Sequence, residues 1–218
     1  MRILFIGNSY TYFGEMPEHT EALLKENGIC ATVHSVTAGG RKLYQNTTPG
    51  DALAARLTEL ISENEYDAVI LQEQSYLPLA NKEKFLLGAK ETAKAVGAKR
   101  TLFYVTWGRH EGCELLDEYG WTRESMTEGL HAAYKEAAVA TGGELSDVGK
   151  AFLLFNKLYP DAMLYTPDLS HPSVLGTSLG CAVHFVTLTK KLPEDLSALD
   201  VSDGEREMIQ RTLKALYA

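Results

Sequence analysis

The sequence has few cysteines, and none of them form a pair at metal-binding spacing. Its 218 residues include three cysteines, Cys30, Cys113 and Cys181, which lie far apart. Structural zinc sites and disulfide frameworks need closely spaced pairs or larger even numbers of cysteines. We therefore expect no metal site and no disulfide framework, and we interpret the three cysteines as small buried or half-buried side chains.

Long apolar runs and a surplus of positive charge are also missing. No stretch approaches the ~18 apolar residues that a membrane-spanning helix needs. The 29 acidic residues outnumber the 21 basic residues, which gives a formal net charge of -8. Such a surface repels phosphate backbones and anionic lipids. We expect neither a nucleic acid nor a membrane as a partner, and the sequence leaves the oligomeric state open.

The first residues, MRILFIG, have the pattern of a buried strand and not of a targeting signal. They lack a basic leader, a long apolar core and a cleavage site, and polar residues follow them at once. This pattern favours a cytoplasmic location for the chain as given, whereas a longer precursor would leave the location open.

Short apolar runs alternate with amphipathic segments along the whole chain. They predict strands at 3–6, 31–36, 68–71, 101–105 and 144–148, and helices at 17–27, 51–64, 82–96, 123–141, 150–158, 172–190 and 202–217. Strands that are apolar throughout are typical of parallel sheets covered by helices on both faces. We therefore predict an α/β fold, a three-layer α/β/α sandwich with a parallel sheet of about five strands, in one domain over 1–218. Residues 108–120 are expected to form a surface loop near the carboxyl edge of the sheet.

A polar segment, Gly7-Asn8-Ser9, follows the first predicted strand. Open α/β sheets bind their ligands at the carboxyl ends of the strands, so Ser9 is expected to face that crevice. A serine becomes a good nucleophile when a histidine takes its proton and a carboxylate orients the histidine. Ser9 is therefore a candidate nucleophile, although this segment taken alone favours an ordinary turn serine.

A second polar segment, DLSHPS, holds the matching residue types. Pro172 suits the first turn of a helix, which places His171 at the junction between a loop and that helix. Asp168 lies three residues earlier and can accept a hydrogen bond from Nδ1 of His171, which leaves Nε2 for Ser9. We predict a triad of Ser9, His171 and Asp168. The alternative is a helix-capping aspartate beside an incidental histidine.

Acyl transfer also needs hydrogen-bond donors for the developing oxyanion. The backbone N–H of Ser9 is one candidate, and Gly39 and Gly40, which follow the second predicted strand, are others because glycine allows close backbone approach. The side-chain amide of Gln72 or of Gln74, at the end of the third strand, is a further candidate. The alternatives are an ordinary glycine turn and loop-fixing glutamines.

Three more residues are candidates for the substrate pocket, namely Tyr10, Glu73 and Trp107. Tyr10 follows the candidate nucleophile and would either line the pocket or anchor the loop. Glu73 would bind substrate hydroxyls or fix a loop, and Trp107 would form a pocket wall or simply pack.

The segments GNSYT and DLSHPS resemble blocks I and V of the SGNH, or GDSL-like, hydrolases. Block I usually reads GDS, so Asn8 departs from that pattern, and Gly40 resembles the block II glycine. LQEQS replaces the usual GxND of block III and is similar to the QGES-type block of carbohydrate acetylesterases. That comparison puts Gln72 in the oxyanion-donor position, with Gln74 second. The resemblance covers nearly the whole chain.

The resemblance implies the flavodoxin-like SGNH hydrolase fold and a Ser-His-Asp esterase that needs no metal or organic cofactor. It implies a small-molecule or carbohydrate ester as substrate, with O-acetyl groups favoured, and an acyl-enzyme on Ser9. A lysophospholipase or thioesterase is the enzymatic alternative. The alternatives from other classes are a flavodoxin-like binding module, with hydroxyls holding a phosphate, and a catalytically silent carbohydrate-binding protein.

Overall fold

The protein is built around one parallel sheet, seen in a computed structural model that describes residues 1–217. Its strands are β1 (Arg2–Gly7), β2 (Thr32–Thr37), β3 (Ala68–Leu71), β4 (Arg100–Val105) and β5 (Glu144–Asp147). All neighbours pair in parallel, in the order β2-β1-β3-β4-β5. The five-stranded parallel sheet is confirmed. The order changes direction at β1, so the crevice between the loops after β1 and β3 is the topological switch point where such folds bind ligands.

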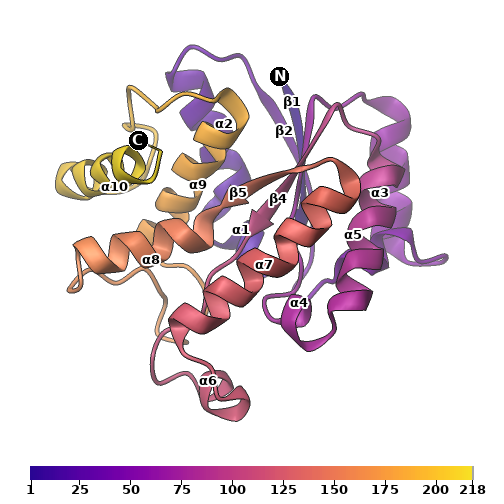
Figure 1. Cartoon of the computed structure of the whole chain (residues 1–218). Coiled ribbons are helices and arrows are strands. Elements are labelled where there is room, and N and C mark those ends of the chain that lie inside the picture. The colour runs from indigo at the N-terminus through magenta and orange to yellow at the C-terminus, as the bar shows by residue number, and fades with distance from the viewer. Residues whose placement is uncertain (218) are drawn as a thin grey trace.

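Helices cover both faces of the sheet (Figure 1). One face carries α2 (Met16–Glu26), α8 (Val148–Leu158), α9 (Val174–Thr189) and α10 (Asp203–Leu216), and the other carries α3 (Ala52–Glu63), α5 (Lys82–Val96) and α7 (Arg123–Thr141). Shorter helical segments form the connections: α1 (Ser9–Tyr12), η1 (Phe13–Glu15), η2 (Leu43–Thr47), α4 (Leu77–Ala80) and α6 (Glu114–Tyr119). The three-layer α/β/α architecture is confirmed.

Alternation along each strand produces two hydrophobic cores. In β1, Ile3 and Phe5 pack under α2 and α9, whereas Leu4 and Ile6 pack against the α3, α5 and α7 side. All four side chains are 0% exposed. Because successive strand residues point to opposite faces, a strand that is apolar at every position must be covered on both sides.

Most helix boundaries follow the expected signals, with two corrections. The Ser202 hydroxyl accepts the Glu205 N–H and so caps α10. The helix expected from residue 172 begins instead at Val174, because Pro172 pairs with Tyr165 in an isolated bridge and Ser173 is the cap. The region expected to be a loop at 108–120 contains the short helix α6.

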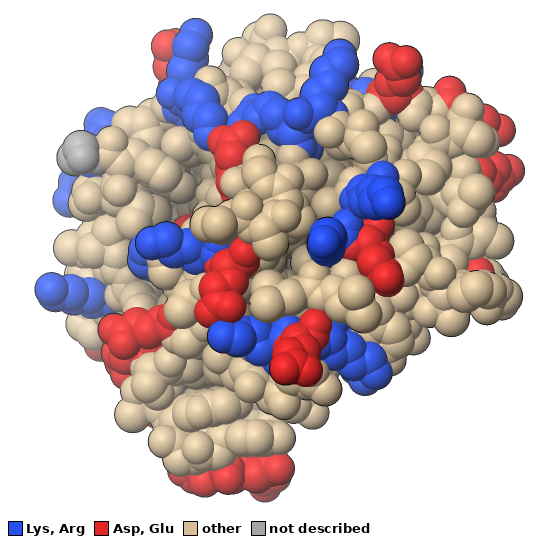
Figure 2. All heavy atoms as spheres, turned by 45° about the vertical axis from the view of Figure 1, so that its right-hand side comes forward, with Lys and Arg blue, Asp and Glu red and all other residues tan. Residues whose placement is uncertain are grey.

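Basic and acidic side chains are interspersed on the face shown in Figure 2, and neither sign forms a continuous field there. Within residues 1–217, no helix is both long and apolar enough to cross a membrane. Cys181 is buried and Cys113 is half-buried, but Cys30 is exposed, so the packing interpretation is wrong for Cys30.

Candidate active site

Ser9 stands at the carboxyl end of β1, where the strand turns directly into the four-residue helix α1. The turn depends on close packing at Gly7: a Cβ added there would lie 2.6 Å from Oε1 of Gln72 and 2.3 Å from Oγ1 of Thr11. Asn8 caps α1, because its side-chain oxygen accepts the Tyr10 N–H. Ser9 is therefore the first residue of the helix and remains half-buried beside the switch point.

Asn8 ties the loop after β1 to the loop after β2. Its side-chain amide donates to the Arg41 carbonyl (2.9 Å), and its backbone N–H donates to Oε1 of Gln72 (2.8 Å). The residue is 2% exposed. An ionised aspartate accepts hydrogen bonds but donates none, so it cannot replace the contact with the Arg41 carbonyl. This contact gives a physical reason for asparagine where GDS is the commoner sequence.

Ser9, His171 and Asp168 form one hydrogen-bonded row, called here the Ser9–His171–Asp168 row. Oγ of Ser9 lies 2.7 Å from Nε2 of His171, and Nδ1 of His171 is hydrogen-bonded to Oδ2 of Asp168. Oδ1 of Asp168 also accepts the backbone N–H groups of His171 and Ser170, both at 2.9 Å, and the Thr166 hydroxyl at 2.7 Å.

Partial burial works against ionisation of Asp168, but the hydrogen bonds to its carboxylate hold its pKa well below the usual range. The carboxylate therefore accepts a proton-bearing Nδ1 of His171 at neutral pH. That tautomer leaves Nε2 as an acceptor for the Ser9 hydroxyl.

The segment that carries Asp168 and His171 is held from three sides. The Trp107 indole donates to the Ser170 carbonyl (3.1 Å), and the Tyr10 hydroxyl lies 2.7 Å from Oγ of Ser170. The His110 N–H donates to the carbonyl of Leu169, a residue held at the positive φ of 59°. The position of the imidazole is thus set by residues from α1 and from the segment after β4.

The backbone N–H of Ser9 is the one amide of α1 that has no partner among residues 1–217. The Asn8 side chain accepts the Tyr10 N–H, and the Asn8 carbonyl accepts the N–H groups of Thr11 and Tyr12. The first amides of a helix have no partner inside it, and here capping satisfies all but that of Ser9. This N–H is available to an oxyanion formed on Ser9.

Gly39 and Gly40 lie next to α1, in the loop that the Asn8–Arg41 hydrogen bond holds. A Cβ added to Gly39 would lie 3.6 Å from the Tyr12 hydroxyl, and Gly40 has a φ of 65°, which favours glycine. Both residues are exposed, and neither backbone N–H has a hydrogen-bond partner within residues 1–217. The structure therefore keeps both glycines as candidate donors.

Gln72 does not present a donor to the cleft, and that prediction is wrong. The residue is 1% exposed. Its amide oxygen accepts the Asn8 N–H (2.8 Å) and the Thr11 hydroxyl (2.9 Å), and its amide nitrogen donates to the carbonyl of Glu73. The Gln72 side chain thus fixes the segment that carries Ser9 through hydrogen bonds to the residues on either side of it, Asn8 and Thr11.

Gln74, the second choice in sequence terms, has the available amide. Its side-chain oxygen accepts the Leu77 N–H (3.0 Å) at the start of α4, which orients the amide group. Its amide nitrogen has no partner within the described part of the chain, and the residue is half-buried.

The three substrate-pocket candidates are buried, so their placement in the pocket is wrong and their alternative roles, packing and loop fixing, apply instead. Tyr10, Glu73 and Trp107 are 3%, 0% and 1% exposed. Trp107 stacks on Phe152, with ring centroids 3.9 Å apart and planes at 3°, and also on Tyr10, with centroids 5.1 Å apart. Tyr10 and Trp107 support the His171 segment from within the core.

Glu73 has the loop-fixing role. Its carboxylate accepts the N–H groups of Leu43 (3.2 Å) and Gln74 (2.6 Å), which joins the loop after β3 to η2. Burial raises the pKa of Glu73 to about 7. One residue that the sequence motifs did not single out, Arg109, also lies at this edge: its guanidinium donates to Oγ of Ser75 (2.9 Å).

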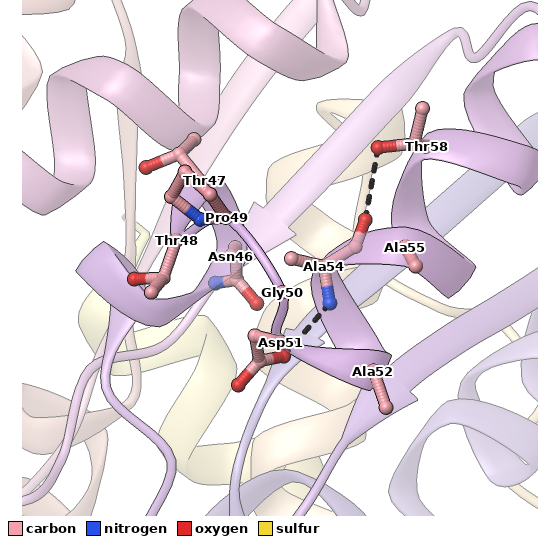
Figure 3. Close-up of a pocket in the computed structure, with 10 residues that line it drawn as sticks. All are labelled: Asn46, Thr47, Thr48, Pro49, Gly50, Asp51, Ala52, Ala54, Ala55 and Thr58. Atoms are coloured by element: carbon pink, nitrogen blue, oxygen red, sulfur yellow. Dashed lines mark hydrogen bonds between the residues drawn. The ribbon is translucent and has the colours of Figure 1, made fainter.

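A separate hollow of about 320 Å³ lies between η2 and the start of α3 (Figure 3). Its polar side chains are already engaged, because Asp51 accepts the Ala54 N–H and pairs with Arg41, and Arg41 also donates to Asn46. None of its lining residues, 46–52, 54, 55 and 58, belongs to the Ser9–His171–Asp168 row. The hollow is therefore distinct from the candidate site.

A serine, a histidine and an ionised aspartate in one hydrogen-bonded row, at the carboxyl edge of a parallel sheet, are the arrangement of a serine hydrolase. The imidazole can take the serine proton, and the neighbouring amides can accept a developing negative charge. The fold and the site thus define the class of protein.

Comparison with known proteins gives the family. No family profile and no curated protein matches the chain. A candidate SGNH hydrolase from Slackia heliotrinireducens is 30% identical in sequence, and its solved structure covers 86% of this chain and 98% of its own, with a TM-score of 0.75. The chain therefore belongs to the SGNH hydrolases and is a serine ester hydrolase.

Two further solved structures share the fold at lower identity. A DUF4886 family protein from Bacteroides uniformis is 16% identical, with a TM-score of 0.81, and the match covers 100% of this chain and 95% of that one. An acetyl xylan esterase, AlAXEase, is 18% identical, with a TM-score of 0.64, and the match covers 86% of this chain and 100% of that one.

Proposed function

We propose that this protein hydrolyses O-acetyl esters of carbohydrates through an acyl-enzyme formed on Ser9. The observation that carries the proposal is the Ser9–His171–Asp168 row, in which Oγ of Ser9 is 2.7 Å from Nε2 of His171. A separation of this size permits direct proton transfer as the serine attacks an ester carbonyl.

The proposed cycle has two halves. Nε2 of His171 takes the proton of Ser9 while Oγ attacks the carbonyl carbon, and ionised Asp168 stabilises the imidazolium that results. His171 then protonates the leaving alkoxide, and the acetyl group stays on Ser9. In the second half, His171 deprotonates a water molecule, which attacks the acyl-enzyme and releases acetate with restoration of the Ser9 hydroxyl.

The proposed oxyanion donors are the N–H groups of Ser9 and Gly40, with Gly39 as the neighbouring possibility, and the amide nitrogen of Gln74. Loss of one such donor typically lowers kcat by about 10²–10³-fold. We expect Gln74→Ala to lower kcat on this scale while the protein stays folded. Gln72→Ala is the matched control, and it should lower the melting temperature because it leaves the Asn8 N–H and the Thr11 hydroxyl without their acceptor.

Two observations support an acetylated carbohydrate as the substrate. The LQEQS segment resembles the block III of carbohydrate acetylesterases, and AlAXEase, an acetyl xylan esterase, shares the fold over its whole length. The exposed glycines beside Ser9 are also compatible with a bulky polar alcohol at the rim of the site.

A fluorophosphonate probe and a series of esters test the proposal. We expect the probe to label the wild type and not Ser9→Ala, with Ser62→Ala, on the distant α3, as the labelled control. Hydrolysis should be fastest with p-nitrophenyl acetate and should release acetate from acetylated xylo-oligosaccharides. Rates that rise steadily with acyl chain length would favour a lysophospholipase or thioesterase, and an unlabelled but folded wild type would favour a silent carbohydrate-binding protein.

A further inference from the structure

Arg109 lies on the segment that runs directly against the loop bearing His171. The neighbours of Arg109 make this contact: the Trp107 indole donates to the Ser170 carbonyl (3.1 Å), and the His110 N–H donates to the Leu169 carbonyl (2.9 Å). From there, Nη2 of Arg109 reaches Oγ of Ser75 at 2.9 Å. Ser75 directly follows Gln74, so the guanidinium is bonded to the neighbour of the proposed oxyanion donor.

Arg109 has no direct ion-pair partner among residues 1–217. Within residues 1–217, no carboxylate lies within 4 Å of its guanidinium, whereas each of the other arginines except the exposed Arg2 pairs with an aspartate or glutamate. Nε of Arg109 is buried and has no acceptor among the described residues. A half-buried cation without a carboxylate partner is costly, and it is well suited to bind an anionic group.

The charge of Arg109 acts on Tyr10, the residue that follows the candidate nucleophile. Burial raises the pKa of Tyr10, and Arg109 is the strongest electrostatic influence that acts in the opposite direction. The Tyr10 ring lies 5.1 Å from the imidazole of His171, and Tyr10 directly follows Ser9. Ser9 and Arg109 are thus both neighbours of Tyr10, and a small ester bound at Ser9 could extend a carboxylate toward Arg109.

We infer that Arg109 is a specificity-determining residue that binds a carboxylate of the substrate, so that the natural substrate is an anionic ester. This inference rests on the proposed function and narrows its substrate class to acidic compounds. The carboxylate belongs either to the alcohol, as in an acetylated uronic acid, or to the acyl group, as in the half-ester of a dicarboxylic acid. Both place a negative charge a few bonds from the scissile carbonyl.

Matched pairs of charged and neutral esters test the inference. For charge on the alcohol, the pair is 4-acetoxybenzoate and 4-acetoxybenzamide. For charge on the acyl group, the pair is the p-nitrophenyl esters of succinic half-acid and of succinamic acid, with spontaneous hydrolysis subtracted. We expect wild-type kcat/KM to favour the charged member of one pair by about tenfold or more, the scale of one charge-assisted hydrogen bond.

The variants separate binding of charge from support of the loop. Arg109→Gln should bring the charged-to-neutral ratio close to one, and Arg109→Lys should retain part of it. Arg123→Gln is the control, because Arg123 already pairs with Glu111 (3.2 Å), and it should leave the ratio unchanged. A purely structural Arg109 would lower the rates for both members equally and keep the ratio, which would overturn the inference.

The outcome also separates this inference from the proposed function. If the neutral esters are cleaved in a Ser9-dependent manner and the wild type shows no preference in either pair, the inference fails and the esterase assignment stands. If no ester is cleaved in that manner, the proposed function fails. Arg109 is then tested by titrating folded protein with 4-hydroxybenzoate and 4-hydroxybenzamide by NMR, where equal affinity refutes the inference. If Arg109→Gln does not fold, two other measurements decide. The inference holds if high salt removes the wild-type preference for the charged ester and Arg109→Lys retains only part of that preference, and it fails if neither change alters the ratio.

Discussion

Replacing Asn8 with aspartate, the residue that GDS sequences carry, should destabilise this protein in a pH-dependent way. The aspartate would still accept the Tyr10 N–H and cap α1. It could not donate to the Arg41 carbonyl, to which the Asn8 amide donates at 2.9 Å. In a site that is 2% exposed, the ionised carboxylate would also lose solvation and face a carbonyl oxygen.

The size of the effect follows from these two contacts. An unpaired buried carbonyl costs about 1–3 kcal/mol, and desolvation of the carboxylate adds to this. We therefore expect Asn8→Asp to lose about 3 kcal/mol at pH 8, or about 6–12 °C in melting temperature for a chain of this size. Burial raises the folded pKa of the new carboxyl group, so the folded state holds its proton where the unfolded chain has lost it. The deficit should grow as pH rises from about 4 and shrink at low pH, where the protonated group can donate again.

Urea unfolding of wild type, Asn8→Asp and Asn8→Ala at pH 4.5 and pH 8 measures the effect. Subtraction of the wild-type values removes the pH dependence that all three proteins share. The alanine variant loses both the cap and the donor, so its deficit should be nearly the same at the two pH values. An aspartate variant as stable as wild type at pH 8, or a deficit that does not change with pH, would refute the reasoning.

Three other changes have defined outcomes. Asp168→Asn should lower kcat by about 10³–10⁴-fold. Because the folded pKa of Asp168 is lowered, this variant should also be less stable than wild type in urea at neutral pH, and the difference should disappear as pH falls through that pKa. Glu73→Gln should gain up to about 3 kcal/mol relative to wild type between pH 5 and pH 8, because the raised pKa of Glu73, about 7, makes wild type lose stability as pH rises over this range. Trp107→Phe should keep the stack on Phe152 but leave the Ser170 carbonyl unpaired, which should cost about 1–3 kcal/mol in thermal unfolding and lower kcat through a less ordered His171.

Much of the fold was predictable because its causes are local in the sequence. Strands that are apolar at every position must be covered on both faces, and this pattern alone indicated a parallel sheet between helices. The helix that starts at Pro172 in the prediction begins at Val174, since Pro172 pairs with Tyr165 across the loop. That pairing requires the loop to fold back on itself, which no local signal reports.

The candidate site likewise has residues that the sequence could predict and residues that needed the structure. Ser9 at the end of the first strand and the Asp168-to-His171 spacing could be recognised as candidates without coordinates, because each segment carries its chemistry within a few residues. For Trp107 and Glu73 the sequence left open a place beside the substrate and a structural role, and the two residues are 1% and 0% exposed. Their residue types suit a pocket wall as well as a core, and only the neighbours that pack on them distinguish the two.

The sequence by itself therefore determined that polar, reactive side chains follow apolar strands, and that a serine, a histidine and an aspartate are among them. The tertiary structure decided which side chains remain available to a substrate. The side-chain oxygen of Gln72 accepts hydrogen bonds from Asn8 and Thr11, residues more than 60 positions earlier in the chain. Among residues 1–217, in contrast, the amide nitrogen of Gln74 has no hydrogen-bond partner and Arg109 has no carboxylate partner. Hydrogen bonds and counter-charges between distant segments form only when the sheet brings them together, so availability is a property of the folded chain.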